Sequence, residues 1–144
     1  MKKTVFSLLV LSLVFSFAAC GGSDKPSEKS EQPKKIDLAG NWKQPNSGSD
    51  ESYQIATIQD KVIEIFWYSE DDETKALYWS GTYAAPEDAK EPYVWVSDND
   101  REKTDGALLA SGDDTKTFTY EKGQLSYEVS ALGVTQTVRL EKAK

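Results

Sequence analysis

The sequence predicts an all-β protein: one small antiparallel up-and-down barrel of about eight or nine strands, preceded by an export signal and a flexible linker. Three observations favour this fold. The chain is rich in tyrosine, tryptophan, valine and threonine, which are common in strands. Its apolar residues recur at every second position, and turn sequences separate these alternating runs. A barrel is the expected closure because it leaves no exposed sheet edge.

The first 19 residues have the three parts of a secretory signal peptide. A basic start at residues 1–3 precedes an apolar run at residues 5–17, and two small alanines stand directly before Cys20. The apolar run is short for a helix, which needs about 20 residues to cross a bilayer. We therefore expect cleavage before Cys20 and no transmembrane span in the mature chain.

Residues 20–35 form the predicted linker, and residues 36–144 form the predicted barrel domain. After Cys20 the linker has no large apolar side chain and is dominated by Gly, Ser, Pro, Lys and Glu. Such a segment cannot bury enough surface to offset its ordering entropy, so we expect a solvated tether. The length of the remaining chain suits a single domain.

Two predicted hairpins near the C-terminus share one apolar face. A two-residue turn at Lys122-Gly123 places Phe118 opposite Tyr127 and Tyr120 opposite Leu125. A second turn, at Leu132-Gly133, continues the same face by placing Tyr127 opposite Val138 and Leu125 opposite Leu140. A one-residue error in register would turn every side chain over, so this agreement supports the strands.

The upstream half of the domain predicts a similar set of strands. A turn at residues 59–61 sets Ile55 against Ile65 and Tyr53 against Trp67, and the acidic loop 69–75 then sets Ile65 against Trp79 and Trp67 against Leu77. Further strands are expected near residues 38–43, 93–97 and 107–111. Core packing is the first interpretation of Tyr53, Trp67 and Trp79.

The charge of the chain argues against nucleic acid as a partner. The sequence has 17 basic and 24 acidic residues. Loss of the signal peptide removes two of the basic residues, so the mature net charge is 15 − 24 = −9. An acidic surface repels polyanions, and no basic stripe with interleaved aromatic residues opposes that effect.

The residues around the cleavage site resemble the lipobox of bacterial lipoproteins. The box reads Phe17-Ala18-Ala19-Cys20, with Phe17 where leucine or valine is usual. The resemblance implies that Cys20 receives a diacylglyceryl group and acyl chains of the palmitate type. It also implies a location on the extracytoplasmic face of the cell membrane, where two acyl chains hold a protein stably. As the only cysteine, Cys20 has no partner for an internal disulfide.

The start of the domain resembles that of lipocalin-like (calycin) barrels. Gly40-Asn41-Trp42 matches their Gly-x-Trp opening. The resemblance implies that Trp42 closes one end of the barrel and that Arg139, near the last strand, packs across it. Another β-barrel or a sandwich remains an alternative. The chain also resembles small surface lipoproteins of Gram-positive bacteria, some associated with prophages, in the stretches 78–82 and 125–133.

The sequence predicts no catalytic residues, no metal site and no cofactor. Without histidine, a Ser-His-Asp triad and a histidine-ligated metal are excluded. A carboxylate hydrolase is a weaker alternative, with Glu64, Asp98 and Asp100 as its candidate acids. The acidic loops 70–73 and 98–102 are better interpreted as solvated turns than as calcium sites, because neither follows the EF-hand pattern.

Four aromatic residues are candidates for ligand or surface recognition: Phe66, Tyr68, Tyr78 and Trp95. The predicted register sets Phe66 across from Tyr78 on the outer face, with Tyr68 two residues along. They form either a cross-strand staple or part of an exposed apolar patch that recognises a partner. Trp95 could line either face.

These features favour a non-catalytic, membrane-anchored binding or interaction module of undetermined ligand and oligomeric state. A small apolar molecule could enter the barrel mouth if the interior is hollow. If the interior is filled, the outer surface would contact a cell-envelope protein. The alternatives are a prophage-type exclusion lipoprotein that interferes with a membrane or wall component, and the carboxylate hydrolase.

Overall fold

The structure, a computed structural model, describes residues 35–45 and 47–144. Three of the sequence predictions lie outside these residues: the signal peptide 1–19, the lipidation of Cys20, and the linker up to residue 34. The described part contains eight strands and one short helix: β1 (Gly40–Lys43), β2 (Ser52–Gln59), β3 (Val62–Ser69), β4 (Thr74–Thr82), β5 (Tyr93–Asp98), α1 (Arg101–Thr104), β6 (Thr115–Glu121), β7 (Gln124–Ala131) and β8 (Val134–Lys142).

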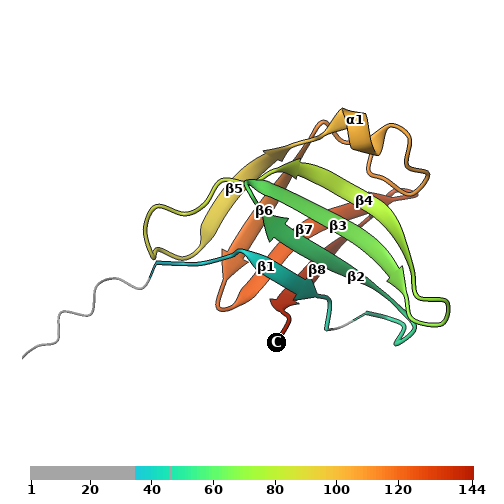
Figure 1. Cartoon of the computed structure of the whole chain (residues 1–144), viewed down its shortest axis with the longest axis horizontal. Coiled ribbons are helices and arrows are strands. Elements are labelled where there is room, and N and C mark those ends of the chain that lie inside the picture. The colour runs from blue at the N-terminus through green and yellow to red at the C-terminus, as the bar shows by residue number, and fades with distance from the viewer. Residues whose placement is uncertain (1–34, 46) are drawn as a thin grey trace, which may run out of the picture. The chain divides into compact units, whose positions relative to one another are not determined.

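The eight strands form one antiparallel sheet in the order β4-β3-β2-β1-β8-β7-β6-β5 (Figure 1). Two four-stranded meanders therefore meet where β1 pairs with β8. The other two edges, β4 and β5, approach each other at a bridge between Gly81 and Asn99. The sheet is a nearly closed barrel, so the predicted all-β up-and-down fold is confirmed, with eight strands.

The predicted strand at residues 107–111 is wrong. This segment follows α1 as a series of turns, with Ala107 N–H donating to the Thr104 carbonyl and Ala110 N–H to the Ala107 carbonyl. Leu108 is almost wholly exposed, so this short apolar run has no core to face. α1 has four residues. Among the residues described, no helix has the length and apolar character needed to cross a membrane.

The interior of the barrel is filled by a single cluster of buried side chains. Trp79, Phe118, Leu125 and Leu140 have no measurable exposure, and Ile58, Ile63 and Ile65 pack with them. Full burial of one such side chain contributes about 1.5–3 kcal/mol. The two C-terminal hairpins have the predicted pairs, including Phe118 with Tyr127 and Leu125 with Leu140. Their register is confirmed.

The predicted register between β2 and β3 is wrong by one residue. Asp60 and Lys61 both have positive φ, at 50° and 68°, and make a two-residue turn rather than one of three. Ile65 therefore pairs with Ala56 instead of Ile55. As a result Gln54, Ala56 and Ile58 are the buried inward residues of β2, and Tyr53 packs against Tyr68 on the other face.

A β-bulge displaces the predicted pairs between β3 and β4. Ile65 pairs with Trp79 as predicted, but Phe66 pairs with Leu77, so Tyr78 is the extra residue. Trp67 consequently pairs with Ala76 and not with Leu77. The bulge turns Tyr78 towards the interior, where it is 5% exposed and stacks on Tyr127.

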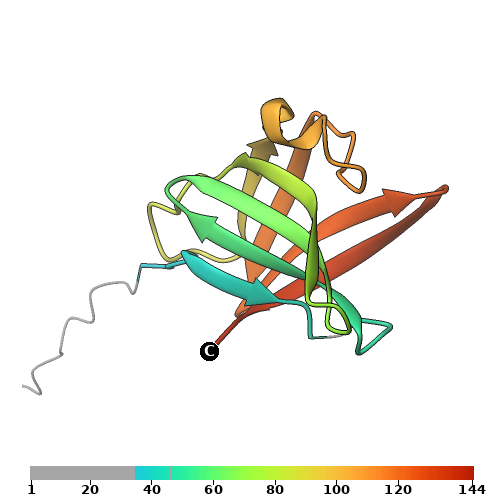
Figure 2. The same cartoon turned by 45° about the vertical axis from the view of Figure 1, so that its right-hand side comes forward.

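Alternation of strand direction gives the barrel two distinct ends. Lys35 enters and β8 finishes at one end, which we call the proximal end. The opposite end, which we call the distal end, contains the described residues of loop 44–51, turn 70–73, segment 99–114 with α1, and the β7–β8 turn at residues 132–133. Figure 2 shows the long β7–β8 hairpin, orange to red, projecting to the right, with α1 at the top of the view.

Candidate functional site

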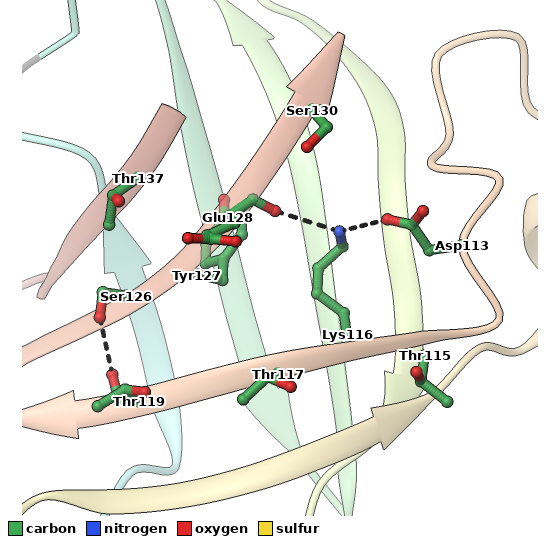
Figure 3. A pocket seen from close by; sticks show the side chains of 10 residues that line it. All are labelled: Asp113, Thr115, Lys116, Thr117, Thr119, Ser126, Tyr127, Glu128, Ser130 and Thr137. Carbon is green, nitrogen blue, oxygen red and sulfur yellow. Dashed lines mark hydrogen bonds and ion pairs between the residues drawn. The ribbon is translucent and has the colours of Figure 1, made fainter. Parts of the chain in front are cut away.

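The clearest hollow in the described chain opens where β6 and β7 separate. Their ladder runs from Glu121–Gln124 to Phe118–Tyr127 and stops there. Beyond that point β6 continues beside β5, and β7 continues beside β8. The two strands diverge towards the distal end, as Figure 3 shows. We call the space between them the β6–β7 cleft.

The β6–β7 cleft has a volume of about 450 Å³. This is within the range of about 300–1,000 Å³ that is common for small-molecule sites. Polar groups dominate the lining because the outward positions of β6, β7 and β8 are mostly threonine and serine. The lining residues are Asp113, Thr115, Lys116, Thr117, Thr119, Ser126, Tyr127, Glu128, Ser130 and Thr137.

Lys116 is the most unusual residue of the cleft, because its charged side chain is only 5% exposed. It occupies an inward position of β6, in line with Phe118. Its Nζ donates to the Glu128 carbonyl oxygen at 3.3 Å and to Asp113 Oδ2 at 2.9 Å. The ammonium also lies over the Tyr78 and Trp79 rings, 5.3 and 5.2 Å from their centroids.

The electrostatics of the cleft follow from these contacts. The hydrogen bond from Lys116, helped by one from Ser111, holds the pKa of the Asp113 carboxyl below its ordinary value. Asp113 is therefore ionised at neutral pH and balances the charge of Lys116. Burial raises the pKa of the Tyr127 phenol well above its ordinary value. The phenol stays protonated and donates to Gln54 Oε1 inside the barrel.

A second, smaller hollow of about 160 Å³ lies at the distal end beside loop 44–51. The Tyr53 hydroxyl donates to Glu70 Oε1 at 2.6 Å, and Lys43 Nζ lies 4.0 Å from the centre of the Tyr53 ring. The hydrogen bond from Tyr53 lowers the pKa of Glu70, and burial raises the pKa of Tyr53. Lys43 Nζ and Glu70 Oε1 form an ion pair at 3.4 Å, and the neutral Tyr53 phenol is hydrogen-bonded to the same carboxylate.

The structure does not bring together the four aromatic residues predicted for recognition. Trp95 is buried and stacks on Phe118, with 5.0 Å between ring centroids. Tyr78 is buried by the bulge, whereas Phe66 and Tyr68 are half-buried on β3. The predicted pair of Phe66 and Tyr78 on the outer face is therefore wrong. Tyr78 instead forms part of the floor beneath Lys116.

The predicted barrel-closing pair of Trp42 and Arg139 is also not formed. Trp42 is buried, donates from Nε1 to the Leu38 carbonyl at 3.0 Å, and meets the edge of Tyr120. Arg139 is exposed and alternates with the buried Val138 and Leu140, so its side chain points outward. The cation of β8 that lies opposite Trp42 in the ladder is Lys142.

Two of the three candidate acids of the hydrolase alternative, Glu64 and Asp100, share one surface lysine. Lys103 Nζ lies 2.8 Å from Glu64 Oε1 and 3.9 Å from Asp100 Oδ2, so one ammonium serves both carboxylates. Asp98 ends β5, and its N–H donates to the Thr82 hydroxyl. In the acidic loop 70–73, Asp72 accepts from the Thr74 hydroxyl. No group of three metal-ligating side chains converges within residues 35–45 and 47–144.

The β6–β7 cleft and Lys116 were missed from the sequence. One signal was present, because Lys116 occupies the inward register that Phe118 and Tyr120 define. A lysine at such a position requires a hydrogen-bond acceptor nearby. The divergence of β6 from β7 leaves no comparable trace, since both strands keep their alternation throughout.

Comparisons with known proteins add no identification. No family model matches the chain, and neither a curated protein nor a solved structure shows significant similarity to it. The class of protein defined by the fold is a small eight-stranded antiparallel barrel with a polar cleft at one end.

Proposed function

We propose that this protein is a lipid-anchored, extracytoplasmic, non-catalytic binding module whose working surface is the distal end of its barrel. The observation that carries the proposal is the position of the β6–β7 cleft. It opens towards the end of the barrel opposite Lys35, where the tether would enter, because the β6–β7 ladder ends at Phe118–Tyr127 on that side. A flexible tether attached at Lys35 would therefore leave the cleft free for a partner.

The anchor is inferred from the sequence. The basic start, the apolar run and the two alanines before Cys20 are the pattern of a processed lipoprotein. Two acyl chains on Cys20 would give stable attachment, because each buried CH₂ contributes about 0.8 kcal/mol. The location and small size would then resemble those of Gram-positive surface lipoproteins.

The polar lining favours a polar partner over the small apolar ligand considered from the sequence. Trp79, Phe118 and Tyr127 are packed in the core cluster and Trp67 packs against it, and of these four only Tyr127 also contributes to the lining of the cleft. The remaining lining groups are hydroxyls, carboxylates and one ammonium. They can orient a partner through hydrogen bonds.

Exposed apolar side chains at the same end support a role in contact. Leu132 is fully exposed at the β7–β8 turn and Val134 is 61% exposed beside it, while Leu108 and Leu109 are exposed in the segment after α1. Exposed apolar residues that gather into one contiguous patch mark interaction surfaces. We propose that they border the contact made by the cleft.

Two measurements on the full chain in its host cell test this function. Labelling with radioactive palmitate should mark the wild type and not Cys20→Ala, which should be released from the membrane fraction. A photoreactive amino acid at Ser130, in the cleft, should give a discrete cross-linked product on intact cells.

The matched control places the photoreactive residue at Asp88, an exposed position at the proximal end. This variant should give no such product. Palmitate labelling that persists in Cys20→Ala would contradict the anchor. Equal cross-linking from Ser130 and Asp88, or none from Ser130, would contradict a working distal end.

A further inference from the structure

The backbone of the β6–β7 cleft offers two facing strand edges that no strand of the described chain pairs. In an antiparallel strand, successive residues direct their N–H and C=O groups to opposite neighbours. The Leu132-Gly133 turn is closed by the pair Ala131–Val134, so Ser130 and Glu128 direct these groups away from β8. The bond from Lys116 Nζ to the Glu128 carbonyl agrees with that direction.

The same reasoning identifies the facing edge of β6. The β6–β7 turn is closed by the pair Glu121–Gln124, so Glu121 directs its N–H and C=O groups towards β7. Thr119, which pairs with Ser126, directs its N–H and C=O groups to the same side. Two and four residues earlier, Thr117 and Thr115 therefore also direct their N–H and C=O groups towards β7. The ladder has already ended at Phe118, so these groups face the cleft.

We propose that the β6–β7 cleft binds an extended basic peptide segment by strand addition, completing the sheet between β6 and β7. The peptide backbone would pair with Glu128 and Ser130 on one side and with Thr115 and Thr117 on the other. Main-chain hydrogen bonds provide the affinity in this mode. This inference rests on the proposed binding function and names its partner.

Charge complementarity indicates a basic partner. Residues 36–144 contain 11 basic and 21 acidic residues, a net charge of −10. Inside the cleft Lys116 and Asp113 neutralise each other, which leaves the exposed carboxylate of Glu128 as the remaining charge of the lining. Lysine or arginine on the peptide would be attracted from a distance and paired on arrival.

The test selects displayed random peptides on the full chain held in lipid vesicles. The peptides enriched by the selection should alternate β-branched and basic residues. Synthetic copies would then be N-methylated at alternate positions, in two complementary patterns. A peptide inserted between β6 and β7 pairs through both sets of N–H groups, so each pattern should weaken binding about tenfold or more, which corresponds to about 1.4 kcal/mol.

A matched pair of variants tests the protein edge. Ser130→Pro removes the N–H that faces the cleft, whereas Ser130→Ala keeps it and removes the hydroxyl. The proline variant should lose about tenfold in affinity and the alanine variant little. If near-ultraviolet circular dichroism shows that Ser130→Pro has lost its tertiary structure, the N-methylated peptides decide the question alone.

Several results would overturn the inference. These are the absence of enriched peptides, enrichment of acidic ones, or binding that survives both N-methylation patterns. Self-association that is abolished in Ser130→Pro would assign the cleft to a second copy of the chain. If peptides fail but Ser130 still cross-links on cells, the binding function stands without this partner; if both fail, the binding function fails as well.

Discussion

Lys116 shows how one residue defines the chemistry of the β6–β7 cleft. A lysine with a 5% exposed side chain requires acceptors, which Asp113 and the Glu128 carbonyl provide. By bonding to that carbonyl, Lys116 bridges β6 and β7 just beyond the end of their ladder. A peptide that enters the cleft would meet this ammonium at its inner limit.

Asp113 should contribute to the acid sensitivity of the protein. Its pKa is lower in the folded state than in the unfolded chain, so the ionised carboxylate stabilises the fold above its unfolded pKa of about 3.9. That contribution disappears as the pH falls through the lower, folded-state value. In thermal melts from pH 6 down to pH 2, Asp113→Asn should lose less stability than the wild type.

A second variant tests whether the hydrogen bond from Lys116 is what lowers the pKa of Asp113. Lys116→Met removes the largest influence on the Asp113 pKa, and should therefore show the same shallower acid dependence from a lower starting stability. Identical acid dependence in the wild type and both variants would contradict this account of the pair.

At the scale of elements, glycine decides which turns can be read from the sequence. Gly123 and Gly133 have φ of 83° and 79°, and the two hairpins that they mark have the predicted register. Asp60-Lys61 adopts a similar turn without glycine, so the β2–β3 register was missed by one residue. The bulge at Tyr78 interrupts the regular pairing of β3 with β4, and no glycine or turn residue marks it in the sequence.

The seam between β4 and β5 depends on Gly81. A Cβ added there would lie 2.4 Å from Ser97 Oγ, 2.5 Å from the Asp98 carbonyl oxygen and 2.7 Å from Trp79 Nε1. Gly81→Ala should therefore force β4 and β5 apart and cost about 1–3 kcal/mol in the free energy of unfolding. Urea denaturation monitored by tryptophan fluorescence measures this loss.

Gly106→Ala is the matched control for the seam, since a Cβ at Gly106 meets no atom within 4 Å. Its effect should stay within about 0.5 kcal/mol, as is usual for surface substitutions. Equal stabilities of the two alanine variants would show that β4 and β5 do not need their close approach.

For the whole molecule, the sequence was sufficient for the fold class but not for the candidate site. The alternation of apolar and polar residues, together with the turn residues, predicted an antiparallel barrel. Both are local signals, because the inward face of each strand can be identified from that strand's own sequence. The β6–β7 cleft depends on where two neighbouring strands stop pairing. That property depends on how β6 follows β5 and β7 follows β8 beyond the end of their ladder, so no local pattern contained it.

The two ends of the barrel also follow from the whole molecule. Eight alternating strands place Lys35 at the proximal end and the cleft with its exposed leucines at the distal end. With a lipid anchor on Cys20, the difference between the two ends would have a function, because the proximal end would be attached and the distal end would be free to bind. The central claim is that the cleft has open strand edges ready to receive a partner.

Amide hydrogen exchange on the full chain tests that claim most directly. Without ligand, the N–H groups of Thr117, Glu128 and Ser130 should exchange rapidly, while Thr119 and Ser126 in the paired ladder stay protected. Addition of a selected basic peptide should protect all three. Slow exchange at these three amides in the free protein, or no change when the peptide binds, would contradict the open cleft and the binding mode built on it.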